Sequence, residues 1–287
     1  MAANDFDPAR KYQEQEEVFF DDGREIELLH FIYNHKDIET IRGNSAKVLA
    51  AIDEYARTKK YLMNVGENKG RIVVDLIKEV KPQTMVELGG YVGYSAVLFA
   101  SAVKEAGGRR YWTLERNPEF AAIIASLTDL AGLSDIVKVV VGPSDASIKR
   151  LHSTAALGHI DMMFLDHYKP AYTTDLKLCE ELKLVTPGSV LVADNVIKPG
   201  NPPYLEYVQM TCEQKRANTK GSTVNGVDTR FANRTAQQYL NREGQEKLDE
   251  TRVGNPNLVY KSELIHSWEP SGVPDALEIT RCTGEEK

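Results

Sequence analysis

The sequence has few cysteines and no long apolar run. Its three cysteines, Cys179, Cys212 and Cys282, lie far apart and lack the spacing of metal ligands, which argues against a disulfide framework and fits a reducing compartment. No stretch approaches the roughly 18 apolar residues of a membrane span, and the N-terminus lacks the apolar core of a secretory signal. We therefore expect a cytoplasmic protein without a membrane segment.

An excess of basic residues is also missing. The chain has 35 Lys and Arg against 42 Asp and Glu, a net charge of −7, and shows no basic stripe. Neutralisation of phosphates by Lys and Arg dominates affinity for nucleic acids, so a nucleic-acid partner is not expected. A small molecule is the better candidate partner, and we expect a monomer or a weak homodimer.

The length of 287 residues is compatible with one large domain. Residues 1–24 are charged and show little periodicity, which predicts a loosely ordered N-terminal extension. Residues 25–287 then form a single domain. Within it, residues 213–257 are rich in Asn, Thr, Gln, Arg and Gly and indicate an insertion, either helical around residues 237–248 or partly mobile.

Strand and helix patterns alternate through the middle of the chain. Helical spacing of apolar residues covers 25–61 and 69–80, ahead of the first strand. Apolar strands are predicted at 84–89, 110–115, 136–141, 159–166 and 189–194, with helices at 94–103, 118–132, 145–157 and 172–185 between them. Segments 258–267 and 276–282 predict a closing antiparallel hairpin. The fold class is therefore α/β: a doubly wound, mostly parallel seven-stranded sheet, Rossmann-like, with ligands at the carboxyl ends of its strands.

A glycine-rich turn at 89–93 follows the first strand. Aligned with the dinucleotide fingerprint, its three glycine positions fall on Leu88, Gly90 and Gly93, so the first glycine is missing. Glu87 would repel a pyrophosphate, whereas it suits a cationic ligand. S-adenosylmethionine, which carries a sulfonium and an ammonium group, fits better than NAD. An NAD-dependent dehydrogenase and a tight turn without a ligand remain alternatives.

The second strand ends in Glu115, 26 residues after Gly89. In nucleotide-binding α/β folds an acidic residue near this place accepts hydrogen bonds from the ribose hydroxyls. A solvated carboxylate at the end of a strand is the alternative.

The fourth and fifth predicted strands end in Asp166 and in Asp194-Asn195. These strands are neighbours in a right-handed doubly wound sheet, so the three side chains should meet at one edge. Three hard oxygen donors suit Mg²⁺. A helix-capping role is the alternative for Asp166, and the tandem Asp194-Asn195 is harder to explain in that way.

Lys169 lies three residues after Asp166 and could reach a substrate oxygen beside the metal. A nearby dication disfavours the ammonium form of a lysine, which makes Lys169 a candidate general base. A solvated surface lysine is the alternative. His167 has no partner at metal-ligand spacing, so we expect it to pack or hydrogen-bond near the adenine of a cofactor.

Five motifs taken together resemble the catechol O-methyltransferase family, whose members use S-adenosylmethionine and Mg²⁺. The resemblance runs from about Ile41 to Val208 and returns weakly at 260–282. The joint presence of LDHYK and ADNV makes it specific. The motifs are MNVGENKG at 63–70, VELGGYVGYSAV at 86–97, LERNPEFAAI at 114–123, DMMFLDHYK at 161–169 and VLVADNVIKPG at 190–200.

The resemblance implies a class I methyltransferase that transfers a methyl group to one hydroxyl of a catechol. It implies that Asp166, Asp194 and Asn195 bind Mg²⁺ and that Lys169 is the general base. The implied substrate pocket contains Lys169 and Asn195 together with Tyr61, Tyr168 and Pro199. The implied cofactor contacts are Met63, Val65, Glu87, Gly89, Tyr91, Tyr94, Ser95, Glu115, Ser144, Asp166 and His167.

The sequence departs from the family pattern at several positions. Tyr61 and Tyr168 stand where the mammalian pattern has tryptophans, and Asp145 replaces a glutamine beside the adenine. A family glutamate that helps to hold the second catechol oxygen aligns with Ile265, with Glu263 and Glu269 nearby. These differences leave two alternatives open: a non-catalytic S-adenosylmethionine-binding protein, and an O-methyltransferase of another vicinal diol.

Overall fold

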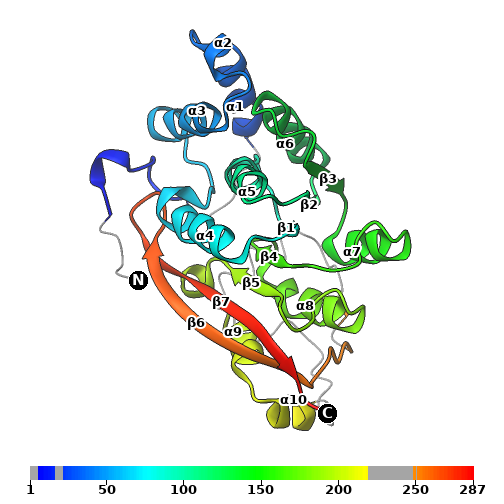
Figure 1. Cartoon of the computed structure of the whole chain (residues 1–287). Helices are drawn as coiled ribbons and strands as arrows, with labels where there is room; N and C mark the ends of the chain where they lie inside the picture. Colours follow the sequence, from blue (N-terminus) through cyan, green and yellow to red (C-terminus); the bar gives the residue numbers. More distant parts are fainter. Residues whose placement is uncertain (1–5, 17–21, 219–247, 250) are drawn as a thin grey trace.

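A seven-stranded sheet forms the centre of the molecule in a computed structural model that describes residues 6–16, 22–218, 248–249 and 251–287 (Figure 1). Its order is β3-β2-β1-β4-β5-β7-β6, with parallel pairing from β3 to β5 and antiparallel pairing of β7 with both neighbours. The predicted fold class is confirmed. The strands are β1 (Thr84–Leu88), β2 (Arg110–Glu115), β3 (Val137–Val141), β4 (Met162–Leu165), β5 (Val190–Ala193), β6 (Leu258–Trp268) and β7 (Pro274–Glu285).

Helices cover both faces of the sheet because the strands are apolar on both sides. Met85 of β1 belongs to the core on one face, and the next residue, Val86, belongs to the core on the other. The first face carries α1 (Arg24–Tyr33), α3 (Ser45–Thr58), α4 (Gly66–Val80), α5 (Tyr94–Glu105) and α6 (Pro118–Leu130), with the short α2 (Ile38–Ile41) beside them. The second face carries α7 (Ser144–Ser153), α8 (Tyr172–Glu181) and α9 (Pro202–Gln209).

Local sequence accounts for several helix ends. The side chains of Asn44 and Asn117 accept hydrogen bonds from backbone N–H groups in the first turns of α3 and α6, and Pro118 occupies the first position of α6. Helix α4 begins at Gly66, three residues before the predicted start at Lys69. Lys69 is therefore inside the helix, and it is fully buried.

The N-terminal segment makes contacts that the sequence did not predict. We expected a loosely ordered extension over residues 1–24. In its described part, the short helix η1 (Pro8–Arg10) precedes Tyr12, whose side chain is only 5% exposed and belongs to the core cluster on the first face. The aromatic residues of this charged segment do not recur at helical or strand spacing, so the sequence pattern did not reveal this contact.

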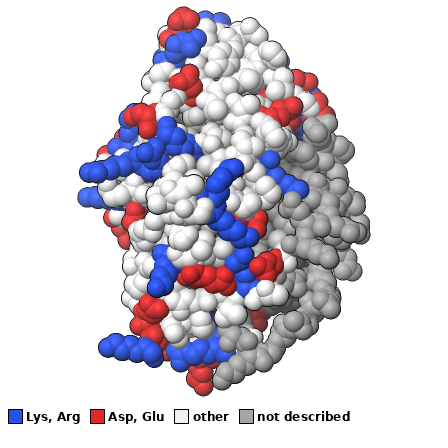
Figure 2. Space-filling model, turned by 90° about the vertical axis from the view of Figure 1, so that its right-hand side faces the viewer, with Lys and Arg blue, Asp and Glu red and all other residues white. Residues whose placement is uncertain are grey.

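The expected insertion at 213–257 is described only at its two ends. Helix α10 (Cys212–Asn218) holds Lys215, whose ammonium lies 3.8 Å from the centre of the Tyr260 ring and donates to the carbonyl of Leu258. The predicted helix around 237–248 falls outside the described residues except for its last position. Among the residues described, none of the helices has the length and apolar character needed to span a bilayer. Acidic and basic side chains are interspersed on the face in Figure 2.

Candidate active site

The predicted site residues gather at the carboxyl ends of β1, β2, β4 and β5. The turn after β1 is tied to its neighbours by the backbone, because Gly89 N–H donates to Leu114 and Asp166 N–H donates to Leu88. Glu115 reinforces the turn. Its carboxylate accepts from the N–H groups of Gly90 at 3.1 Å and Tyr91 at 3.0 Å. The role of Glu115 as a ribose ligand stays a prediction.

Glu87 is fully buried beneath this turn. It pairs in register with Thr113 of β2, and neither of its carboxylate oxygens has a hydrogen-bond partner among the described residues. Burial raises the pKa of Glu87 to about 7, against the opposing effect of nearby hydroxyl groups such as that of Ser95. A buried carboxyl group with spare hydrogen-bonding capacity at the end of β1 fits the predicted cationic ligand.

Tyr91 and Tyr94 extend the turn toward the helices of the first face. The Tyr91 hydroxyl donates to Glu25 of α1 at 2.8 Å, and its ring packs edge-on against Phe120. Tyr94 and Ser95 open α5 and are both buried. The sequence pattern alone gave no role to Glu25, because a glutamate in the first turn of a helix is usually exposed.

His167, Asp175 and Ser144 form a hydrogen-bonded group beside β4. His167 Nε2 lies 2.8 Å from Asp175 Oδ2, and the Ser144 hydroxyl donates to the same oxygen at 2.5 Å. The His167 ring stacks on Tyr172 with 4.8 Å between centroids, and its Nδ1 is buried without a partner among the described residues. A buried nitrogen without a partner has spare hydrogen-bonding capacity, and the place of His167 near an adenine stays a prediction.

Lys169 links the ends of β4 and β5. It opens the short helix η2 (Lys169–Ala171), is 6% exposed, and donates from Nζ to Asp166 Oδ1 and to the Tyr172 hydroxyl, both at 2.8 Å. The Tyr172 hydroxyl in turn donates to the backbone carbonyl of Asp194. The alternative of a solvated surface lysine is therefore wrong.

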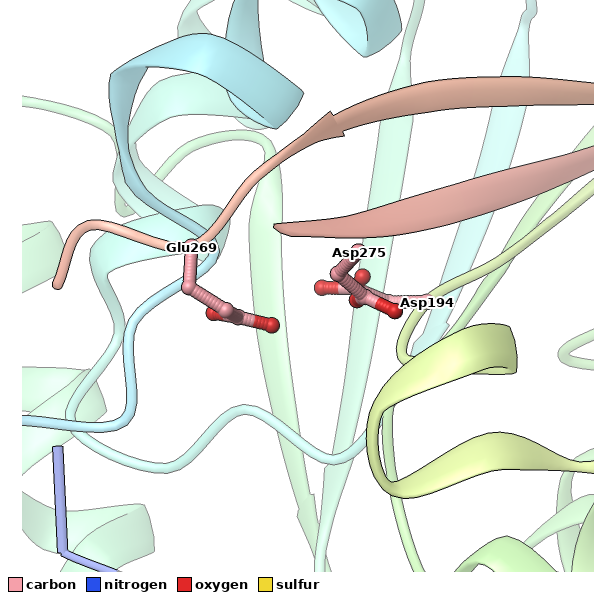
Figure 3. Close-up of side chains that lie close together, drawn as sticks. All are labelled: Asp194, Glu269 and Asp275. Carbon is pink, nitrogen blue, oxygen red and sulfur yellow. The ribbon is translucent and has the colours of Figure 1, made fainter. Parts of the chain in front are cut away.

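A second buried lysine, which sequence reasoning missed, lies beside Asp194. Lys69 Nζ donates to Asp194 Oδ1 at 2.5 Å, to Glu269 Oε1 at 2.7 Å and to Asp275 Oδ2 at 3.1 Å. Figure 3 shows these three carboxylates converging from the end of β5 and from the two sides of the β6–β7 turn. No local motif joins residues so far apart in sequence, and only the fold brings them together.

This acidic cluster, Asp194, Glu269 and Asp275, has more negative charge than Lys69 can balance. Burial is the largest cause that raises the pKa of Asp194 to about 6 and of Glu269 to about 8, and the neighbouring carboxylates add to it. Burial opposes the ammonium form of Lys69, yet the neighbouring carboxylates raise its pKa well above the ordinary value. Because three carboxyl groups face one ammonium group, a further cation beside the cluster would favour their ionised forms.

Asn195 adds an amide to the site. Its Nδ2 donates to Glu269 at 2.6 Å and to Asp275 at 3.3 Å, which leaves its amide oxygen on the opposite side, away from these two acids. Asp275 also accepts from the backbone N–H of Lys198 at 2.8 Å. It thereby holds η3 (Val196–Gly200), the segment that contains Pro199.

The structure corrects the alignment near the hairpin. Ile265 lies in the middle of β6, paired with Leu277 of β7. Glu269 lies just beyond the end of β6, where it contacts both Lys69 and Asn195. Ile265 is thus too far along β6 to reach the site, whereas Glu269 reaches it; a role of Glu269 in substrate binding stays a prediction.

The remaining predicted residues lie on loops and helix ends around this edge. Tyr61 is 5% exposed, and its carbonyl accepts from Arg24. Met63 and Val65 lie between α3 and α4, Tyr168 directly precedes η2, and Pro199 is exposed. The contacts of these residues with a ligand stay predictions.

A family model described as "O-methyltransferase" matches residues 33–214, which is more than half of the chain. The chain belongs to the O-methyltransferase family. The match includes β1 to β5 and the glycine-rich turn, together with Lys69, Lys169 and Asp194. The segment before residue 33 and the β6–β7 hairpin, with Glu269 and Asp275, lie outside it.

Within the O-methyltransferase family, the chain is similar to curated proteins named for catechol O-methyltransferase and transmembrane O-methyltransferase. "Catechol O-methyltransferase" of Bos taurus is 42% identical over 186 residues, and the enzyme of that name from Mus musculus is 43% identical over 178 residues. "Transmembrane O-methyltransferase" of Homo sapiens is 35% identical over 168 residues. The match to the bovine enzyme covers 65% of this chain and 66% of the relative, and the match to the mouse enzyme covers 62% and 66%. The match to the human transmembrane protein covers 58% of this chain and 57% of the relative. The chain thus spans slightly under two thirds of the length of each catechol enzyme.

Solved O-methyltransferases share the fold. The Bacillus cereus O-methyltransferase in complex with SAH has a TM-score of 0.52 at 20% identity, covering 88% of this chain and 96% of that one. TomG from Streptomyces achromogenes, in complex with SAM, has a TM-score of 0.51 at 19% identity, covering 93% and 100%. These likenesses agree with the class I methyltransferase fold predicted from the sequence.

Proposed function

We propose that this O-methyltransferase transfers a methyl group from S-adenosylmethionine to one hydroxyl of a catechol. The observation that carries the proposal is the placement of Lys169 against Asp166 and, through the Tyr172 hydroxyl, against Asp194. A buried amine thus lies beside the residues that would hold Mg²⁺ and within reach of a bound diol, and a bound dication would disfavour its ammonium form, which suits Lys169 to accept a proton. The 42% identity to bovine catechol O-methyltransferase supports the choice of substrate.

The cofactor would lie over the glycine-rich turn. Glu87 and the unpartnered Nδ1 of His167 offer spare hydrogen-bonding capacity at the two sides of this region. Glu115 has its carboxylate at the turn, where a ribose would pass. The further contacts that we propose, by resemblance to the family, are Met63, Val65, Gly89, Tyr91, Tyr94, Ser95, Ser144 and Asp166.

Asp166, Asp194 and Asn195 would hold Mg²⁺. Their donor set fits this ion, because two carboxylates and an amide oxygen are hard ligands and the surrounding acidic cluster has more negative charge than Lys69 balances. When bound, Mg²⁺ supplies Lewis-acid stabilisation of the deprotonated diol. In this proposal, the affinity for Mg²⁺ depends on how the fold orients the carboxylates of Asp166 and Asp194.

The side chains around the diol have separate tasks in this proposal. Lys169, in its neutral form, takes the proton from the reacting hydroxyl. The oxygen then forms a bond to the methyl carbon as the bond from that carbon to sulfur breaks, with the reacting atoms held about 3 Å apart before transfer. Glu269 accepts a hydrogen bond from the second hydroxyl, and Tyr61, Tyr168 and Pro199 enclose the ring.

The test compares catechol with resorcinol, which has the same two hydroxyls in a 1,3 arrangement. Transfer of a labelled methyl group from S-adenosylmethionine is measured for both in the presence of Mg²⁺. We expect a monomethylated product from catechol and at least a hundredfold lower rate with resorcinol, which cannot present adjacent oxygens. Equal rates would contradict chelation of a vicinal diol, and no product from catechol would contradict the proposed substrate.

A further inference from the structure

We propose that the N-terminal segment Phe6–Glu16, here named the N-terminal strap, positions Glu269 in the active site by holding the β6–β7 turn. This inference rests on the proposed function for the role of Glu269. The strap lies outside residues 33–214, the part of the chain that the family model matches.

Polar contacts join the strap to the turn. The backbone N–H of Tyr12 donates to the carbonyl of Pro270 at 3.0 Å, and the hydroxyl of Ser271 donates to Gln15 at 2.7 Å. The turn itself is closed by the N–H of Gly272, which donates to the carbonyl of Glu269 at 2.8 Å. The strap thus contacts the two residues that directly follow Glu269.

An apolar contact fixes the other side of the turn. The ring of Phe6 lies 6.0 Å from the Trp268 ring and is placed over Gly272. A Cβ atom at Gly272 would lie 2.8 Å from the Phe6 ring, and this glycine has φ +80°. The strap and the turn are therefore in direct contact on both sides of Glu269.

Helix α4 supports the turn from the opposite direction. Pro270 packs onto Gly66 so closely that a Cβ atom at this glycine would clash with the Pro270 ring. Lys69, one helical turn further on, donates to Glu269. The turn is thus held between the strap and the first turn of α4, and its position decides where the Glu269 carboxylate lies.

The strap is anchored in the rest of the domain, so it can transmit this constraint. Tyr12 is buried, and its hydroxyl donates to Asp53 of α3 and accepts from Asn64. The backbone N–H of Gln13 donates to the carbonyl of Ala56 in α3 at 3.0 Å. Tyr12 is therefore a positioning residue that connects α3 to the hairpin turn.

The experiment uses the full-length chain with Tyr12→Ala, Phe6→Ala and the control Tyr33→Ala. Tyr33 is an exposed tyrosine on α1 that bonds to Ser126, away from the turn. Amide hydrogen exchange of residues 269–273 is measured by mass spectrometry, together with KM for catechol, kcat and the Kd for S-adenosylmethionine.

We expect exchange at 269–273 to be at least tenfold faster in Tyr12→Ala and Phe6→Ala. We also expect KM for catechol to rise at least fivefold while the Kd for S-adenosylmethionine stays within twofold of wild type. A general loss of folding would instead raise exchange throughout the sheet and would weaken cofactor binding as well. A raised KM for catechol with an unchanged Kd for S-adenosylmethionine therefore identifies a positioning role. Phe6→Ala, at the less buried end of the strap, serves if Tyr12→Ala does not fold.

Unchanged exchange at 269–273 in folded Tyr12→Ala or Phe6→Ala would overturn the inference, and so would faster exchange with an unchanged KM for catechol. The experiment distinguishes a failure of this inference from a failure of the proposed function. If wild type methylates no catechol, the proposed function fails while the exchange data still decide whether the strap holds the turn. If wild type methylates catechol and both variants behave like it, only the role of the strap fails.

Discussion

Lys69 Nζ lies 2.5 Å from Asp194 Oδ1, a contact between residues 125 positions apart that joins helix α4 to the end of strand β5. Both side chains are almost completely inaccessible to solvent. Since Glu269 and Asp275 share the same ammonium group, one lysine is the common hydrogen-bond donor to three carboxylates contributed by the end of β5 and by the β6–β7 hairpin. The charge balance of the candidate site and the attachment of the hairpin therefore depend on the same residue.

Replacing Lys69 by methionine should destabilise the protein by about 3 to 5 kcal/mol near neutral pH, because it leaves buried carboxylates without a counter-charge. The loss should become smaller toward pH 5. Glu269, whose pKa is raised to about 8, is largely protonated already at pH 7.5, and Asp194, whose pKa is raised to about 6, takes up a proton as the pH falls to 5, so less uncompensated charge remains; Asp275, whose pKa is lowered, keeps its charge. Urea unfolding at pH 7.5 and pH 5 measures the difference.

The control for this variant is Lys104→Met. Lys104 forms an exposed ion pair with Asp135, and exposed pairs contribute at most about 1 kcal/mol. A Lys69→Met variant that loses no more stability than Lys104→Met would contradict the view that the buried cluster depends on this lysine.

Glu87→Gln should stabilise the ligand-free protein above pH 7. The pKa of Glu87 is raised to about 7 from an ordinary value near 4.5, so its contribution to stability is fully present below about pH 4.5 and is lost as the pH rises through 7. Glutamine does not titrate, and the variant should gain up to about 3 kcal/mol over wild type at pH 8. Denaturant unfolding from pH 4 to pH 8 tests this, with the exposed Glu119→Gln as control. A stability difference that is independent of pH would show that the pKa of Glu87 is not raised in the folded protein.

Glu269→Gln should lower kcat/KM for catechol on the order of tenfold above pH 8, where Glu269, with a pKa of about 8, is ionised and its charge-assisted hydrogen bond to the diol is replaced by a weaker neutral one. The Kd for S-adenosylmethionine should change little, because Glu269 contacts Lys69 and Asn195 rather than the glycine-rich turn. Ile265→Val, in the middle of β6, is the matched control and should behave like wild type. Equal kinetics for both variants would remove Glu269 from the substrate site.

Asp194→Ala should abolish methyl transfer while S-adenosylmethionine still binds within a few fold of wild type. Asp194 lies at the end of β5 among the acidic cluster, whereas the cofactor contacts are proposed around the turn after β1. Isothermal titration with the cofactor, run beside the activity assay, separates the two effects. Retained turnover in this variant would exclude Asp194 as a metal ligand.

Much of the fold could be predicted because apolar strands alternate with amphipathic helices. The five parallel strands and the closing hairpin lie where the pattern placed them, and the adjacency of β4 and β5 follows from the handedness of strand connections. Asp166, Lys169, Asp194 and Asn195 follow strand ends, so topology alone predicted that they would be neighbours.

Other parts of the site could not be predicted because long-range packing decides them. Lys69 looks like an ordinary polar residue on a helix until the hairpin places Glu269 and Asp275 beside it. Ile265 was given the place of Glu269 because sequence alone does not show that β6 continues to Trp268. Tyr12 lies in a charged segment without helical or strand periodicity, and it contacts a turn more than 250 residues later.

The most direct test of the account is the rate of methyl transfer from labelled S-adenosylmethionine to catechol by wild type and by Lys169→Met, each with Mg²⁺ and with EDTA. We predict product only for wild type with Mg²⁺, while S-adenosylmethionine binds both proteins equally well by titration. Turnover by Lys169→Met at the wild-type rate, or a wild-type rate unaffected by EDTA, would contradict the account.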